Sequence, residues 1–154
     1  MTEAHWRRAL PGEIDAVEAV LTDPQFFAVL EAVPRDRLEE ALTGTDRRLF
    51  VWAEGAEPMA FAYLSGCNGP RPKLEEFATL RRGAGVGGRA LPALVALMAA
   101  EKPGGCLWLH VVPENAVAIR LYRRCGFGRD EIIPAGWTTR LGVTTDLLRL
   151  HHDL

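Results

Sequence analysis

The sequence predicts an α/β protein in which helices flank a mixed β-sheet. In the first half, the apolar segments Leu49–Ala53 and Met59–Leu64 flank a turn-like stretch, which predicts an antiparallel hairpin. In the second half, strand-like and helix-like segments alternate, which predicts crossover connections. Because one chain contains both kinds of connection, a mixed sheet is favoured over a purely parallel or purely antiparallel one.

The other elements follow from apolar periodicity and from the positions of glycine and proline. Five further strands are expected at Trp6–Leu10, Lys73–Leu80, Cys106–Val112, Gly128–Ile133 and Thr144–His151. Helices are expected at Ile14–Leu21, at Pro34–Leu42, from about Gly88 to Lys102, and from Asn115 to Cys125. Gly126 is placed to cap the last helix, and Pro92 suits the third only in or just past its first turn.

Composition describes an ordinary globular chain and excludes several classes of function. The 154 residues fit a single domain covering 1–154, with 48% apolar and 25% charged residues. A formal charge of 18 − 20 = −2 gives no basis for binding nucleic acid, and the longest apolar run, Ala90–Ala100, is too short to span a membrane. Three widely spaced cysteines predict neither disulfides nor a metal site, so a cytoplasmic protein without metal is expected.

A glycine-rich loop follows the strand Lys73–Leu80 and leads into a helix. Glycines allow close approach of the backbone, and the free amides of a helix N-terminus bind anions. The same residues satisfy two patterns: R-x-x-G-x-G at Arg82–Gly87, typical of the pyrophosphate loop of acyl-CoA transferases, and G-x-G-x-x-G at Gly83–Gly88, typical of dinucleotide sites. The dinucleotide pattern wants an acidic residue about 20 positions further on, where this chain offers only His110. A plain glycine-rich turn is the third possibility.

A second motif decides between these alternatives. The segment Leu107–Phe127 contains N-x-x-A-x-x-L-Y-x-x-x-G-F with every named position present, from Asn115 through Tyr122 to Phe127. It resembles the second cofactor motif of the GNAT N-acetyltransferases, and with the Arg82–Gly87 loop the resemblance covers about residues 73–128. It implies a mostly antiparallel central sheet of about six or seven strands, flanked by about four helices, that splays in its middle to admit the pantetheine arm of acyl-CoA.

The resemblance also implies roles for individual residues. Asn115 and Tyr122 are two helical turns apart and so project from nearly the same face. Asn115 would contact the pantetheine arm, and Tyr122 would be the general acid for the departing thiolate; alternatively, Asn115 only caps the helix and Tyr122 only packs. The other implied cofactor contacts are Phe77, Ala78, Thr79, Arg82, Gly83, Ala84, Gly85, Val86, Gly87 and Gly88. The spacing from Thr79, the last strand contact, to Arg82 is two residues shorter than is common in the family, which affects the register of the strand contacts.

Two residues are candidates for the base that deprotonates the amine. His110, five residues before Asn115, matches the position of a glutamate base in ribosomal-protein N-terminal acetyltransferases, although it is equally compatible with a structural role. Glu75 is the alternative, on the other splayed strand. Glu76 is expected to point away from the site, because side chains alternate along a strand.

The expected function is transfer of an acetyl or related acyl group from acyl-CoA to a primary amine by direct attack. The partner would be a small-molecule or peptide amine, and a homodimer is possible. The family's acceptor site would correspond here to Leu21–Leu42 and Pro134–Val143, where Trp137 and Phe26–Phe27 either line a pocket or pack. A non-catalytic acyl-CoA-binding or regulatory module is the main alternative, and a dinucleotide-binding protein is the other.

Overall fold

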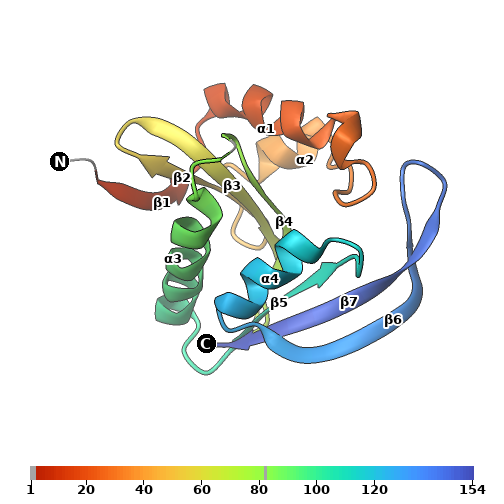
Figure 1. Cartoon of the computed structure of the whole chain (residues 1–154). Helices are drawn as coiled ribbons and strands as arrows, with labels where there is room; N and C mark the ends of the chain where they lie inside the picture. The colour runs from red at the N-terminus through yellow and green to blue at the C-terminus, as the bar shows by residue number, and fades with distance from the viewer. Residues whose placement is uncertain (1–2, 82) are drawn as a thin grey trace.

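The computed structural model describes residues 3–81 and 83–154, which form one seven-stranded sheet with helices on both faces (Figure 1). The strands are β1 (Ala4–Arg8), β2 (Arg48–Glu54), β3 (Glu57–Ser65), β4 (Lys73–Thr79), β5 (Cys106–Val111), β6 (Gly128–Thr138) and β7 (Thr144–Asp153). The helices are α1 (Ile14–Leu21), α2 (Arg35–Glu40), α3 (Val86–Glu101) and α4 (Ala116–Arg124), with short 3-10 turns at Pro11–Glu13 and Pro24–Phe26.

The sheet has the order β1-β2-β3-β4-β5-β7-β6. Every neighbouring pair is antiparallel except β4 and β5, which are parallel and connected through α3. The expected mixed, mostly antiparallel sheet is therefore confirmed. A doubly wound parallel sheet, which the dinucleotide alternative requires, is not the architecture of this chain.

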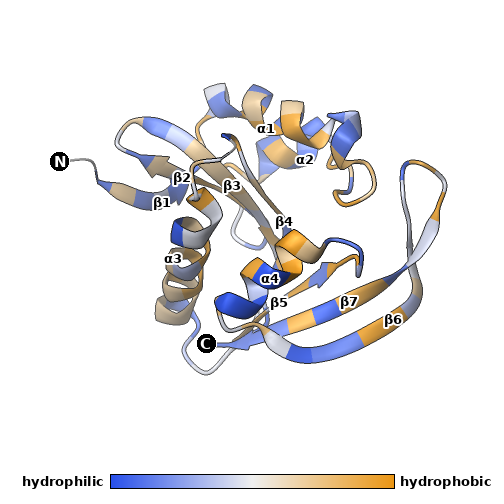
Figure 2. Ribbon diagram, in the orientation of Figure 1, coloured by the Kyte–Doolittle hydropathy of each residue, from blue (hydrophilic) through white to orange (hydrophobic). Residues whose placement is uncertain are grey.

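Two apolar cores lie on opposite faces of the sheet. Helices α1 and α2 bury Ile14, Val17 and Leu38 against β2 and β3. Helices α3 and α4 bury Leu91, Leu94, Met98 and Tyr122 against the other face, from β2 to β7. Figure 2 shows apolar colours along β3 and β4 in the middle of the sheet, and both apolar and hydrophilic colours on α1, α2 and the β6–β7 hairpin. No helix in the described part of the chain has the length and apolarity needed to cross a bilayer.

Several elements differ in extent from the expectation. The first strand is Ala4–Arg8 rather than Trp6–Leu10, because its pairing with β2 runs from Ala4↔Glu54 to Arg8↔Phe50. Helix α2 is shorter than expected, and β6 continues past Ile133 to Thr138. Much of the segment Pro134–Val143 is therefore an extension of the β6–β7 hairpin rather than a loop.

Pro92 also lies deeper in its helix than the sequence suggested. Because α3 begins at Val86, Pro92 occupies the second turn and not the first. Its missing amide leaves the carbonyl of Gly88 without the usual helical donor. Helix formation nevertheless continues to Glu101, with Leu91, Leu94 and Met98 fully buried against the sheet.

Candidate active site

The sheet splits between β4 and β5. These strands pair only at Lys73↔Trp108 and Leu74↔Leu109 and then diverge. The other edge of β4 stays paired with β3 as far as Thr79, opposite Ala60. No strand of the described residues therefore lies beside the edge of β4 from Glu75 to Thr79 that faces the split, and the backbone groups of this edge are able to pair with an extended ligand.

Two small cavities occupy this split, one toward α4 and one toward the β6–β7 hairpin. The first has a volume of about 60 Å³ and is bounded by Phe77, Asn115 and Tyr122. The second, of about 70 Å³, is bounded by Lys73 and Trp137. The residues that line both are Val29, Glu75, Glu76, His110 and Val111. The two cavities thus share the middle of the split and place Glu75, Glu76 and His110 together.

A β-bulge in β4 decides which side chains reach the split. Tyr63 pairs with Glu76, but the next residue of β3, Leu64, pairs with Leu74, so Glu75 is an extra residue. Leu74 faces the α3–α4 core, whereas Glu76 shares the opposite face with Tyr63. Both Glu75 and Glu76 line the cavities, and the expectation that Glu76 points away is wrong, because regular alternation breaks at the bulge.

Glu76 is the residue that sequence reasoning ranked too low. Its side chain is only 8% exposed, and its Oε1 accepts a hydrogen bond of 3.0 Å from the backbone amide of Glu31. Burial raises the pKa of this carboxyl to about 8, with the charges of Glu31 and Glu75 acting in the same direction. The Glu31 amide and the charge of Arg140 oppose this rise. A carboxyl with a pKa near the working pH suits a general base.

Glu75 reaches the split, as expected, but its oxygens are already engaged. Oε1 accepts a hydrogen bond of 2.6 Å from the hydroxyl of Ser65, and Oε2 lies 3.3 Å from the ammonium of Lys73. An ion-paired and hydrogen-bonded carboxylate is a weaker proton acceptor than a poorly solvated one. The geometry therefore favours Glu76 over Glu75 for proton transfer.

His110 lies where the sequence placed it, on β5 and in both cavities. The guanidinium of Arg149 donates to its Nε2 over 3.2 Å, and its ring centroid lies 5.2 Å from that of Trp108 with the two rings nearly perpendicular. Burial, followed by the charges of Lys73 and Arg149, lowers the pKa of His110 to about 4. The imidazole is therefore neutral at neutral pH, and it is a weak base.

Helix α4 presents Asn115 and Tyr122 to the same cavity, as their spacing predicts. Asn115 does cap the helix, since its Oδ1 accepts from the amide of Ala118 at 3.3 Å, and it also lines the cavity. Tyr122 is 8% exposed, with its ring 5.7 Å from that of Phe127. Burial first, and the charge of Glu76 second, raise the pKa of the Tyr122 phenol. The phenol therefore stays protonated and is able to donate.

The glycine loop forms the N-terminus of α3. Gly85 is the N-cap, with a φ of +64° that favours glycine, and among the described residues no side chain caps the free amides of the first turn. A Cβ at Gly87 would lie 3.0 Å from Leu121, so α3 and α4 approach closely here. Gly83, Ala84 and Gly88 are exposed, and Val86 is buried. Arg82, expected to bind the pyrophosphate, lies outside the described residues.

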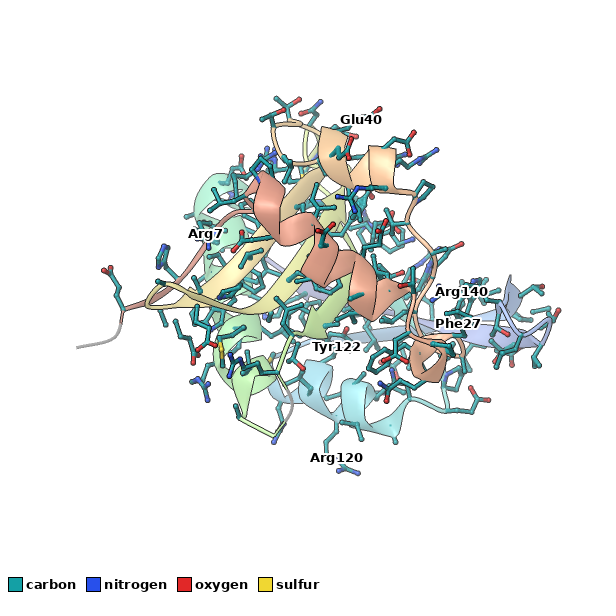
Figure 3. All side chains as sticks on the ribbon, turned by 90° about the horizontal axis from the view of Figure 1, so that it is seen from above. Arg7, Phe27, Glu40, Arg120, Tyr122 and Arg140 are labelled. Carbon is teal, nitrogen blue, oxygen red and sulfur yellow. The ribbon has the colours of Figure 1, made fainter. Side chains whose placement is uncertain are left out.

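The two segments that were expected to form an acceptor site meet at Arg140, which the sequence did not single out. Its guanidinium donates to the carbonyls of Leu21 at 2.5 Å and Leu30 at 2.7 Å, and lies 4.0 Å from the ring centroid of Phe27. Figure 3 shows Arg140 and Phe27 side by side where the β6–β7 hairpin meets the segment after α1. Arg140 thus joins two segments that close one end of the split, while Trp137 lines it.

A family model for GNAT acetyltransferases matches residues 14–127, which include the glycine loop, both walls of the split and all of α4. This chain belongs to the GNAT acetyltransferase family. No curated protein sequence matches this acetyltransferase. No group of His, Cys, Asp or Glu among its described residues is arranged to hold a metal ion.

Solved structures of N-acetyltransferases share the fold of this GNAT acetyltransferase. The Escherichia coli ribosomal-protein-S18-alanine N-acetyltransferase has a TM-score of 0.75 at 19% identity, covering 98% of this chain and 94% of that one. The Vibrio cholerae spermidine N-acetyltransferase, in complex with CoA and spermine, has a TM-score of 0.81 at 18% identity. The match covers 97% of this chain and 95% of that one. Arabidopsis thaliana NAA60, in complex with acetyl-CoA, has a TM-score of 0.79 at 14% identity, and the match covers 99% of both chains.

Proposed function

We propose that this acetyltransferase moves an acetyl group, or a related acyl group, from acyl-CoA to a primary amine by direct attack inside the split. One observation carries the proposal: Tyr122 and Glu76 line the same cavity although they come from opposite faces of the sheet. A proton donor and a proton acceptor thus meet in the opening between β4 and β5. That opening is where an extended ligand lying along β4 would end.

The residues present fit the acyl donor. The free amides of the first turn of α3, at Val86, Gly87 and Gly88, suit the pyrophosphate, together with Arg82 as the family resemblance implies. The unpaired edge of β4 at Phe77, Ala78 and Thr79 suits the amides of pantetheine. Asn115, at the start of α4, lines the cavity in which the thioester would lie.

The chemistry then needs two proton transfers by side chains and one to solvent. The acceptor amine enters as an ammonium, because lysine-like amines have a pKa of about 10.4, and ionised Glu76 takes one proton from it. The amine nitrogen attacks the thioester carbonyl, a C–N bond forms and the C–S bond breaks. Tyr122 gives its proton to the sulfur and the nitrogen gives its second proton to solvent, so the products are a neutral amide and CoA thiol. Solvent afterwards reprotonates Tyr122 and takes the proton from Glu76.

Gly88 offers a test that leaves the fold intact. A Cβ at this exposed position meets no atom within 4 Å, so Gly88→Asp places a negative charge at the first turn of α3 without a clash. Because acidic residues are favourable near a helix N-terminus, stability should not fall. We expect the Kd for CoA to rise about tenfold or more in Gly88→Asp, and much less in the neutral, isosteric Gly88→Asn.

Calorimetric titration with CoA gives the Kd, and thiol release from acetyl-CoA with a panel of amines gives the activity. Equal Kd values for Gly88→Asp and the parent protein would refute the pyrophosphate site. CoA binding without thiol release for any amine would point instead to a non-catalytic acyl-CoA-binding module.

A further inference from the structure

A third and larger cavity opens from the acceptor end of the split. It has a volume of about 340 Å³, and it shares Glu75 and Glu76 with the two smaller ones. Its lining residues are Glu31, Ala32, Val33, Pro34, Arg37, Arg47, Tyr63, Glu75 and Glu76. An acceptor whose amine lies beside Glu76 therefore has room for the rest of its chain here.

The lining of this cavity carries groups of both charges. It includes the carboxyl groups of Glu31, Glu75 and Glu76; Glu75 is bound by Lys73 and Ser65, and Glu76 accepts from the amide of Glu31. It also includes two exposed guanidiniums, those of Arg37 from α2 and Arg47 from the segment before β2. A molecule that fills the cavity thus meets both carboxyl groups and guanidiniums.

Arg37 and Arg47 are available to a ligand. In the part of the chain that the structure describes, neither guanidinium forms an ion pair with a carboxylate, although the charges of Glu75 and Asp46 act on Arg47 from a distance. Arg35, on the same short helix as Arg37, instead lies 2.8 Å from Asp15, 3.0 Å from Glu18 and 3.3 Å from Glu39. One arginine of α2 is therefore used for the fold and the other faces the cavity.

Arg47 is also fixed relative to the proposed base. Its Nη1 donates to the hydroxyl of Tyr63 over 3.4 Å, and Tyr63 is the cross-strand partner of Glu76. Cross-strand partners share a face of the sheet, so the guanidinium and the Glu76 carboxyl lie over the same strand pair. This arrangement matches a molecule with an amine at one end and an anionic group at the other.

We propose that the acceptor is a primary amine whose far end carries an anionic group, with a carboxylate as the simplest case. The inference rests on the proposed function, since it takes the reacting amine to lie beside Glu76. Guanidinium binds carboxylate through two parallel hydrogen bonds, which favours such an acceptor. A polyamine would place a second ammonium against Arg37 and Arg47, and like charges repel. We therefore expect this protein to prefer an anionic acceptor over a diamine, although it shares its fold with a spermidine N-acetyltransferase.

Matched acceptors test this preference directly. δ-Aminovalerate, cadaverine and pentylamine share one carbon chain and differ only in a terminal carboxylate, ammonium or methyl group. Amidated dipeptides in which glycine is followed by aspartate, lysine or leucine form a second arm, which separates small-molecule from peptide acceptors of the same chemistry. In at least one arm we expect kcat/KM for the anionic member to exceed that for the cationic member by about tenfold or more.

Variants show whether the arginines cause the preference. Arg47→Gln and Arg37→Gln should each lower kcat/KM for the anionic acceptor several-fold and leave the uncharged one nearly unchanged. The double variant Arg37→Glu with Arg47→Glu should reverse the preference toward the cationic acceptor. Arg35→Gln is the matched control on the same helix, and it should leave the preference as it is. Turnover of the uncharged acceptor reports that each variant is folded.

The outcomes separate the two proposals. The inference is overturned if the cationic acceptor reacts faster than the anionic one in the arm that shows activity. It is also overturned if Arg47→Gln and Arg37→Gln leave the preference unchanged. In both cases the proposed acyl transfer still holds. If no amine in either arm releases thiol from acetyl-CoA, the proposed transfer itself is refuted, and with it the inference that depends on it.

Discussion

The two sides of the split are built in different ways. On the cofactor side, the glycine loop and α4 are continuous stretches of chain, and Asn115 and Tyr122 are brought together by helical spacing alone. On the acceptor side, Glu76 depends on a bulge, and Arg140 contacts carbonyls 119 and 110 positions away in the sequence. The proposed donor half thus depends on local sequence, whereas the proposed acceptor half depends on contacts between distant parts of the chain.

The strongest test of this comparison is Tyr122→Phe on the cofactor side. The variant keeps the ring that packs against Phe127 and removes only the proton donor. We expect kcat to fall by about 10²–10⁴-fold, while the Kd for CoA is unchanged. Steady-state kinetics and calorimetric titration measure the two effects. An equal loss of turnover and CoA affinity would contradict the general-acid role.

On the acceptor side, Glu76→Gln should have the next largest effect. Glutamine mimics the protonated carboxyl in shape, so the fold should persist while kcat falls by about 10²-fold. In the parent protein, activity should rise with pH as Glu76, with its pKa of about 8, becomes ionised. The pH–rate profile of Glu76→Gln should lack that limb.

His110→Gln is the matched comparison for the base. Because the pKa of His110 is about 4, His110 is already neutral where activity rises with pH. In this variant the rise in activity should therefore stay near pH 8. If the rise of activity with pH shifts in His110→Gln and persists in Glu76→Gln, then His110 and not Glu76 is the base.

The same two residues should give stability opposite dependences on pH. The folded-state pKa of Glu76 is above that of an unfolded glutamate, so its contribution is complete below about pH 4.3 and is lost as pH rises through about 8. The loss amounts to at most about 4–5 kcal/mol, at about 1.4 kcal/mol per unit. The pKa of His110 is depressed, so its contribution is complete above about pH 6.5 and is lost as pH falls through about 4.

Urea unfolding at about pH 5 and about pH 9 measures the Glu76 contribution. Glu76→Gln should lose less stability than the parent protein over this interval, whereas His110→Gln should lose about the same amount as the parent. An identical alkaline loss in the parent and in Glu76→Gln would show that Glu76 is ionised in the folded protein throughout.

Arg140→Met should have the smallest effect, and one confined to the acceptor side. The change leaves the carbonyls of Leu21 and Leu30 without their donor, at a cost of about 1–3 kcal/mol in the free energy of unfolding. The KM for the amine should rise a few-fold and the Kd for CoA should stay constant. Arg120→Met, on the outward face of α4 (Figure 3), is the control and should change neither. A weaker affinity for CoA in Arg140→Met would show that the two sides are coupled.

What could be predicted from the sequence follows the same division. Helix Ile14–Leu21 has the predicted bounds, and Asn115 and Tyr122 share a cavity as predicted, because periodicity within a helix is a local property. His110 and Glu75 do reach the split. The protonation state of His110 could not be predicted, because it depends on Arg149 and Lys73, which folding brings close. Arg140 has no local signature, since its partners are carbonyls of distant residues.

The bulge at Glu75 has a consequence for the number of carboxyl groups in the split. With Glu75 removed, Leu74 and Glu76 would still pair with Leu64 and Tyr63, so regular alternation would return and the Glu76 carboxyl would keep its place beside Tyr63. The extra residue therefore adds a second carboxylate to the split without turning either of its neighbours to the other face of the sheet.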